Sequence, residues 1–246
     1  MGIFWRVLSA ERLKMSKSFV WLLVIGSPAV AMLIGALANM EEEGQTITWE
    51  VLLSVMSLVH AMFFLPVLSG VFAALICRAE HADGGWKQLL ALPVTRTSVY
   101  LAKYTMIMAL LAVVQLLFFA AVLGVGALRG VDVPIPWPLF LSSIFGGWLA
   151  CMPLAALQLL VSQSWSSFGA PLALNVSLTM PNMLIANSAT YGPYYPWVQP
   201  MLAMSPFGKE RFGAFNLPLE SLMTVVLGSL ILFLGAGLLS FRRKAV

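Results

Sequence analysis

Charged residues are scarce in this sequence. Asp, Glu, Lys and Arg together make up only 10% of its 246 residues, whereas hydrophobic residues make up 60%. A soluble domain carries about 25% charged residues, so the charges here are too few to cover a surface in contact with water. The scarcity excludes an ordinary soluble fold. It predicts an all-α, polytopic membrane protein in which residues 1–246 form a single transmembrane domain.

The residue patterns of enzymes and metal sites are missing as well. The chain has only two histidines and two cysteines, and it contains neither a GxSxG nor an HExxH motif. Gly84 and Gly85 are not followed by the GK[ST] of a phosphate-binding loop. We therefore expect no catalytic residue, no bound metal and no cofactor in this chain. If ATP drives the protein, another polypeptide binds it.

His60 is the clear exception to the absence of ionisable groups inside the apolar runs. Ion-coupled transporters usually place several such groups at mid-depth, and His60 has no second one beside it. We interpret it as a hydrogen-bonded packing residue, with a ligand or proton relay as the alternative. The net charge of +4 does not indicate nucleic-acid binding, because basic residues in membrane proteins report orientation.

Six apolar runs are long enough to cross a bilayer. They cover about 19–38, 51–77, 100–123, 139–161, 168–186 and 219–241. The second run is longer than a straight crossing needs, so we expect it to tilt or to bend at Pro66. Residues 1–17 mix bulky apolar and charged side chains, which predicts either a helix lying in the membrane interface or only a basic flank.

Basic residues are unequally divided between the two sides of the predicted bundle. Of the 14 lysines and arginines, all but three lie on the side of the N-terminus. The three on the other side are Arg129, Lys209 and Arg211. Because cytoplasmic loops carry an excess of Lys and Arg, this asymmetry predicts that both termini are cytoplasmic.

The interval 78–103, on the predicted cytoplasmic side, is the only long polar stretch with ordered helix signals. Asp83 is placed to cap a short helix, and Pro93 is placed to end it. Three apolar residues between them share one helix face at the spacing i, i+3 and i+4: Trp86, Leu89 and Leu90. The pattern predicts a short amphipathic helix on the membrane surface. Its apolar face, which includes the aromatic ring of Trp86, would be available to a partner.

This interval and the layout of spans resemble the permease subunits of ABC-2-type transporters, most of all the small permeases of bacterial lantibiotic immunity and bacitracin resistance. The matching segments are LSAERLKMSKS (8–18) and RAEHADGGWKQLLALPVTRTSVYLAKY (78–104). In that family an acidic residue after the second span precedes a W-x-x-L-L-x-x-P pattern, a polar–basic group and a lysine. The corresponding residues here are Glu80, Trp86, Leu89, Leu90, Pro93, Thr95, Arg96 and Lys103.

The resemblance implies that a pair of permeases works with two copies of an ATPase subunit, which bind ATP and Mg. It implies that the short helix is the coupling helix, whose Trp86, Leu89 and Leu90 dock in a groove of the ATPase. Lys87 and Arg96 would then meet acidic residues at the rim of that groove. The alternative for Trp86 is an anchor at the lipid interface.

Glu80 resembles the acidic residue that links movement of the ATPase to the permease. Its alternative is a helix-capping or solvated acid. On the predicted outer side, four aromatic residues lie close together in the sequence: Tyr191, Tyr194, Tyr195 and Trp197. They could contact an amphipathic peptide, but we favour an interfacial aromatic belt.

The resemblance thus implies a permease of the bacterial cytoplasmic membrane that expels an amphipathic antimicrobial peptide. The second permease of the pair is expected to be a related, unlike chain, and otherwise a second copy of this one. Two alternatives remain: the same architecture with another cargo, such as a lipid, polysaccharide or drug, and a membrane adaptor or sensor without transport.

Overall fold

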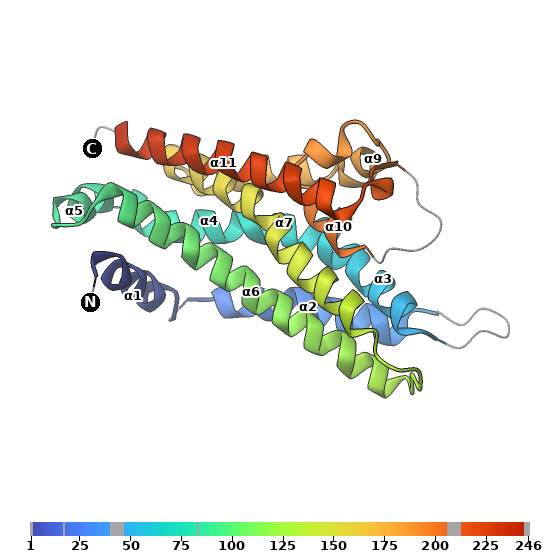
Figure 1. Ribbon diagram of the computed structural model, residues 1–246. Coiled ribbons are helices and arrows are strands. Elements are labelled where there is room, and N and C mark those ends of the chain that lie inside the picture. The colour runs from blue at the N-terminus through green and yellow to red at the C-terminus, as the bar shows by residue number, and fades with distance from the viewer. Residues whose placement is uncertain (1, 17, 40–46, 83, 206–212, 244–246) are drawn as a thin grey trace.

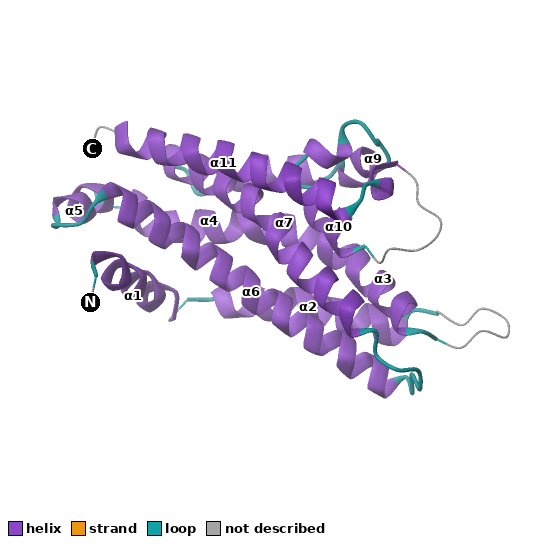
Figure 2. Cartoon of the chain, in the orientation of Figure 1, coloured by secondary structure: helices purple, strands orange, loops and turns teal. Residues whose placement is uncertain are grey.

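The computed structural model describes residues 2–16, 18–39, 47–82, 84–205 and 213–243, and within these ranges the chain is helical without strands (Figures 1 and 2). The elements in chain order are α1 (Ile3–Ser16), α2 (Val20–Leu37), α3 (Trp49–Val59), the π-helix η1 (His60–Phe64), α4 (Leu65–His81), α5 (Gly85–Ala91), α6 (Arg96–Leu128), α7 (Trp137–Ser164), α8 (Gly169–Thr179), α9 (Asn182–Ala186), η2 (Gly192–Tyr194), α10 (Gln199–Met204), η3 (Gly213–Asn216) and α11 (Leu219–Arg243). Several charged residues used in the sequence analysis lie outside the described ranges, namely Asp83, Lys209 and Arg211.

Five helical stretches are long and apolar enough to cross a membrane. They are Val20–Leu37, Trp49–His81, Arg96–Leu128, Trp137–Ser164 and Leu219–Arg243. Each overlaps one of the predicted spans, so the all-helical class is confirmed for the described residues, and five of the predicted spans coincide with helices that are candidates for crossing a membrane. α6 and α7 have more than half of their apolar windows buried, whereas α11 has only 17% buried. α11 therefore lies at the outside of the bundle.

The predicted span over 168–186 is not a continuous helix. α8 has only 11 residues, which is about 16 Å of helix and roughly half the thickness of a bilayer core. The chain turns at Met180 and Pro181 before α9 begins. Pro181 has no N–H to continue the hydrogen bonding of α8, and this explains the break.

The bend predicted at Pro66 takes the form of a π-helical turn. The N–H of Leu65 donates to the carbonyl of His60, five residues earlier, instead of four. Pro66 cannot donate to the carbonyl of Met62, and the side-chain amide of Asn182 donates to that carbonyl instead, at 2.8 Å. The carbonyl freed by the proline is therefore satisfied from α9, as a protein in a lipid environment requires.

His60 is fully buried beside this turn and packs flat against Phe118, with ring centroids 4.0 Å apart. Gln115 donates its amide N–H to the carbonyl of Ile144, so its oxygen faces His60 Nε2 at 2.9 Å and accepts the proton there. The other ring nitrogen, Nδ1, then accepts from the hydroxyl of Ser27 at 2.6 Å. The predicted hydrogen-bonded packing role of His60 is confirmed.

α1, α5 and the last turn of α11 gather at one end of the bundle, although they are far apart in sequence (Figure 1). α1 packs against α6, and α5 packs against the end of α4. The opposite end carries α9, η2 and α10 (Figure 1). The candidate site lies at the end where α1 and α5 meet.

Candidate functional site

The start of α5 depends on two glycines. Gly84 precedes the helix with φ of 71°, a left-handed conformation that glycine adopts without strain. A Cβ on Gly85 would lie 2.7 Å from the carbonyl oxygen of Ala79, so only glycine allows α5 to fold back this closely on α4. The predicted cap, Asp83, lies outside the described residues, and Gly84 occupies the N-cap position.

The end of α5 follows the sequence prediction. The helix stops at Ala91, and Pro93 comes two residues later. Thr95 then caps α6, and its side-chain oxygen accepts a hydrogen bond from the backbone N–H of Ser98 at 3.1 Å. Thr95 therefore has a local structural role at the joint between α5 and α6.

Trp86 points into the protein and not toward a partner. Its side chain is only 7% exposed, and its ring packs edge-on against Phe241 of α11 at 5.2 Å. Its indole N–H donates to Nδ1 of His81 at 3.3 Å, and the ammonium of Lys103 lies 5.6 Å from its ring centroid. This burial places Trp86 against the bundle, whereas the sequence predicted that it lies on an outward-facing surface.

The remaining residues of α5 divide between the core and the surface. Leu89 and Leu90 are half-buried and pack against the core. Lys87 and Gln88 are exposed, and Leu92 just after the helix is 56% exposed. The i, i+3, i+4 face predicted from the sequence exists, but it is the face that α5 turns toward its own bundle.

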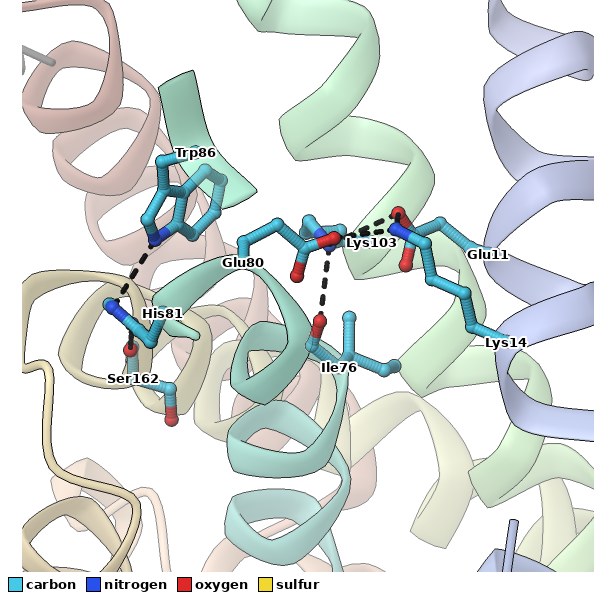
Figure 3. Close-up of polar contacts among 8 residues, drawn as sticks. All are labelled: Glu11, Lys14, Ile76, Glu80, His81, Trp86, Lys103 and Ser162. Atoms are coloured by element: carbon cyan, nitrogen blue, oxygen red, sulfur yellow. Dashed lines mark hydrogen bonds and ion pairs between the residues drawn. The ribbon is translucent and has the colours of Figure 1, made fainter. Parts of the chain in front are cut away.

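A cluster of four charged residues lies directly beneath α5 (Figure 3). Oε1 of Glu80, near the end of α4, is 2.5 Å from Nζ of Lys14 and 3.0 Å from Nζ of Lys103. Oε1 of Glu11, in α1, is 3.0 Å and 3.1 Å from the same two nitrogens. Lys103 also donates to the carbonyl of Ile76 at 3.1 Å. We call Glu11, Lys14, Glu80 and Lys103 the ion cluster.

The ion cluster is neutral overall, and three of its four members are almost completely removed from water. Glu11, Glu80 and Lys103 are each at most 3% exposed. Burying a charge is costly unless it is paired, and removing one partner of a buried pair commonly costs about 3–5 kcal/mol. Because the four charges come from three elements, the cluster fastens α1, α4 and α6 to one another at this end of the bundle.

Lys14 is the member of the ion cluster that reaches water. Burial lowers its pKa, but the carboxylates of Glu11 and Glu80 outweigh burial and raise the pKa above its ordinary value of 10.5. A raised lysine pKa contributes stability that is fully present below the unfolded pKa and is lost only as the pH rises through the folded one. The contribution of Lys14 is therefore constant throughout the neutral range.

Arg96 binds backbone carbonyls at the end of α11. Its guanidinium donates to the carbonyls of Phe241 and Arg242 at 3.3 and 2.9 Å, and so caps the C-terminal end of α11. In return, Arg242 donates to the hydroxyl of Thr97 through two nitrogens, at 3.1 and 2.9 Å. The sequence predicted that Arg96 meets acidic residues at the rim of a groove in the ATPase. In the structure it instead joins the start of α6 to α11.

A groove of about 410 Å³ opens between α1 and the α5–α6 connection. Most of its lining is apolar, and Arg6, Glu11 and Lys14 add charge to it. The apolar lining residues are Ile3, Val7, Ala10, Leu89, Leu92, Pro93 and Val94. This groove, which the sequence analysis did not predict, is the open surface nearest the ion cluster.

The sequence analysis missed Glu11 and Lys14 as members of the ion cluster. A signal for Glu11 was present, because it falls between Val7 and Met15 at the spacing of four that marks one helix face. All three residues are buried against the bundle. A carboxylate in the middle of an apolar stripe predicts a buried ion pair, although nothing local identifies its partner.

The four outer aromatic residues do not act as one group. Trp197 is buried and donates to the side-chain oxygen of Asn175 at 2.8 Å, while the Tyr195 hydroxyl donates to a backbone carbonyl of α8 at 2.6 Å. Only Tyr191 and Tyr194 are exposed, at 73% and 69%. Both of them, together with Tyr195, line a shallow hollow of about 520 Å³ beside α9.

Comparison with known protein families matches residues 7–182 to the family described as ABC-2 family transporter protein. The chain belongs to the ABC-2 family. The match runs from within α1 to the start of α9, so it includes all four residues of the ion cluster, α5 and the lining of the groove except Ile3 and Arg6. A comparison with curated proteins finds no match.

Membership of the ABC-2 family accounts for the general character of the molecule. The family consists of membrane components of transporters, which are generally non-catalytic, and it implies partnership with an ABC ATPase. The five long apolar helices agree with a membrane protein. In this ABC-2 protein the ion cluster and α5 lie together at one end of the bundle (Figures 1 and 3).

Proposed function

We propose that this ABC-2 protein is the permease subunit of an ABC transporter, and that a separate ATPase subunit moves its helices by way of α5. The observation that carries this proposal is the ion cluster, in which Glu80 beside α5 is paired with Lys14 and Lys103 within 3.0 Å. α5 meets this cluster through Trp86, whose ring centroid lies 5.6 Å from the ammonium of Lys103. A surface helix in contact with a cluster that joins α1, α4 and α6 is suited to passing on a movement imposed from outside.

The docking surface proposed for the ATPase is the groove together with the exposed side of α5. The groove offers apolar residues from two elements, and Arg6 and Lys14 in its lining are basic. Lys87 adds a further positive charge on the exposed side of α5. An apolar groove with a basic edge fits a partner segment that carries apolar anchors and acidic neighbours. In this arrangement Leu92 and the half-buried Leu89 contact the ATPase, whereas Trp86 does not.

The route of the movement follows from the contacts of α5. Trp86 packs on Phe241, so a displacement of α5 acts on α11. Glu80 lies at the base of α5 and is bound to Lys103, so the same displacement acts on α6 and, through Lys14, on α1. Trp86 and Glu80 thus act inside the permease, after docking.

The membrane topology proposed here has six crossings, with the broken segment α8–α9 as the fifth. α1 and the end of α11 lie at the same end of the bundle (Figure 1), and this arrangement requires an even number of crossings. The five long helices supply five of them. With the excess of Lys and Arg at that end, both termini are cytoplasmic, in the membrane of a bacterial cell.

The proposed cargo is an amphipathic antimicrobial peptide, expelled from the membrane for immunity or resistance. Support comes from the resemblance of residues 8–18 and 78–104 to lantibiotic-immunity permeases. It also comes from the exposed pair Tyr191 and Tyr194, whose rings can contact both apolar and polar groups of a peptide. The complete transporter would contain two ATPase copies and a second permease, either a related chain or another copy of this one.

Docking can be tested by purifying the tagged protein with its ATPase in mild detergent. The double variant Lys87→Glu, Leu92→Glu reverses one charge and places another at the groove. Because anchor residues at an interface contribute about 2 kcal/mol or more each, we expect at least a roughly thirtyfold loss of ATPase affinity. Both residues are exposed, so insertion and folding should be unchanged.

Arg243→Glu is the matched control, since Arg243 is also an exposed basic residue at this end of the bundle. Its complex should retain the ATPase. If the double variant retains a full complement of ATPase, the docking surface is wrong. If the unaltered protein is recovered without any nucleotide-binding subunit, the adaptor or sensor alternative replaces the transporter.

A further inference from the structure

A second, smaller pocket lies on the other side of α4 from the ion cluster. It occupies about 200 Å³ between the last turns of α4 and α7 and the start of α8. Its polar side chains are those of Arg78, His81, Ser162, Ser166 and Ser167. Among the residues that the structure describes, no Asp or Glu lines it, and Asp83, which follows Ala82 of the lining, lies outside them. The described lining therefore presents hydrogen-bond donors and positive charge.

Ser162 supplies a buried hydroxyl that lacks a partner. Its side chain is only 2% exposed, and within the part of the chain that the structure describes its Oγ makes no hydrogen bond. Other hydroxyls of these helices bind the carbonyl four residues earlier, as Ser164 does at 2.7 Å. Leaving a buried hydroxyl unpaired is unfavourable. Ser162 belongs to the lining of the pocket, so a ligand that reached this hydroxyl would supply the missing partner.

The backbone of Ser162 is held in place from α4. His81 Nε2 lies 2.7 Å from the Ser162 carbonyl, and the opposite ring nitrogen accepts from Trp86 (Figure 3). Both nitrogens of His81 are therefore engaged, with Nε2 donating. The hydroxyl of Ser162 points away from the carbonyl that His81 binds (Figure 3).

Arg78 provides the positive charge of the pocket. Its guanidinium lies 5.4 Å from the ring centroid of Phe168, a cation–π contact that orients the group without using its N–H donors. Among the described residues, all four ion pairs belong to the ion cluster, and none involves Arg78. Arg78 is exposed and lines the pocket, and a planar, permanently charged guanidinium in such a place is suited to the oxygens of a phosphate.

The start of α8 adds further donors. The first N–H groups of a helix have no partner inside the helix and carry a partial positive charge. Ser167 lies two residues before α8, and its oxygen accepts from the N–H of Ala170 at 3.4 Å, so its hydroxyl hydrogen remains able to donate. Helix N-termini of this kind bind anions.

We propose that this pocket binds a phosphate group. Arg78, Ser162 and Ser167 line the pocket beside the N-terminus of α8, and this set of donors suits an anion with several acceptor oxygens. The phosphate can come from the headgroup of an anionic lipid or from a small soluble phosphate. This site is distinct from the groove, and its existence does not depend on the proposed ATPase docking.

Binding can be measured on the full-length protein in a neutral detergent by native mass spectrometry and calorimetry. Three probes separate the sources: dihexanoyl-phosphatidic acid, dihexanoyl-phosphatidylcholine and inorganic phosphate. We expect one phosphatidic acid or one inorganic phosphate per chain, with at least roughly tenfold weaker binding in Arg78→Gln because a charge-assisted hydrogen bond is lost. Arg12→Gln, which changes an exposed arginine of α1, should bind like the unaltered protein.

Ser162→Ala separates a binding role from a structural one. Removing an unpaired buried hydroxyl should leave the ligand-free thermal midpoint unchanged or higher, while the rise in midpoint caused by the bound probe should shrink. Binding of phosphatidic acid alone identifies a lipid site, and equal binding of inorganic phosphate identifies a soluble ligand. If neither anion binds, or if Arg78→Gln binds both as tightly as the unaltered protein, the proposal is overturned.

Discussion

The two ends of the bundle hold their short helices by different chemistry. At the end with α1 and α5, the ion cluster joins elements through buried charges, with Lys103 and Glu11 3.1 Å apart. At the end with α9 and α10, neutral side-chain amides join the elements instead. Asn182 donates to the carbonyls of Met62 and Trp197 at 2.8 and 3.0 Å. One end is fastened by charge pairs and the other by neutral hydrogen bonds.

This difference indicates what each end has to do. Neutral amides satisfy carbonyls that a proline or a broken helix leaves unpaired, and in lipid they have no water to replace them. Asn175 likewise donates to the carbonyls of Pro66 and Val67 at 3.0 and 3.2 Å. Charged groups interact over longer distances than neutral hydrogen bonds do. The ion cluster is therefore better suited to remain connected while α5 is displaced.

The largest effect on stability is expected for Lys103→Met. The variant leaves the buried carboxylates of Glu11 and Glu80 with Lys14 as their one remaining cation in the ion cluster. We expect a loss of about 3–5 kcal/mol in the free energy of unfolding, because it leaves a buried charge uncompensated. Titration with SDS from a mild detergent measures this loss.

Two further variants make that experiment specific. Lys87→Met removes an exposed lysine from the same region, and it should change stability by no more than about 0.5 kcal/mol. Adding Glu11→Gln to Lys103→Met restores the charge balance and should recover part of the loss. An unchanged stability in Lys103→Met would show that the cluster does not fasten these helices.

A smaller loss is expected at the other end of the bundle for Asn182→Ala. This change leaves the buried carbonyl of Met62 without its donor beside Pro66. An unpaired buried polar group costs about 1–3 kcal/mol, so the loss should be smaller than that of Lys103→Met in the same titration. Asn187→Ala, in the turn after α9, is the control and should have little effect. The reverse order of the two losses would contradict the contrast between the ends.

Much of the fold followed from the sequence because long apolar runs have few alternatives to helices in a membrane. A tilt or a bend at Pro66 is predicted because the second apolar run is longer than a straight crossing needs, and the structure has a π-helical turn just before this proline. Pro181 also lacks an N–H, but the sequence predicts a single span across it. Composition measures how apolar a segment is, and it does not show where its hydrogen bonding stops.

The candidate site was harder to predict because its decisive contacts are long-range. The spacing of Trp86, Leu89 and Leu90 correctly placed them on one face, but spacing within a helix does not tell which way that face turns. Its direction is set by Phe241, 155 positions further along the chain than Trp86. Glu11 pairs with Lys103, which lies 92 positions away in the sequence. No local sequence pattern predicts a contact of this kind.

The central claim is that Glu80 transmits ATPase movement through the ion cluster. The most direct test is ATP hydrolysis and cargo release by the purified permease–ATPase complex in lipid vesicles, comparing Glu80→Gln with the unaltered chain and with Glu50→Gln, a change of an exposed carboxylate in α3. The account predicts that the Glu80→Gln complex assembles fully but hydrolyses ATP with little cargo release, while Glu50→Gln behaves like the unaltered chain. Full cargo release per ATP in the Glu80→Gln complex would contradict it.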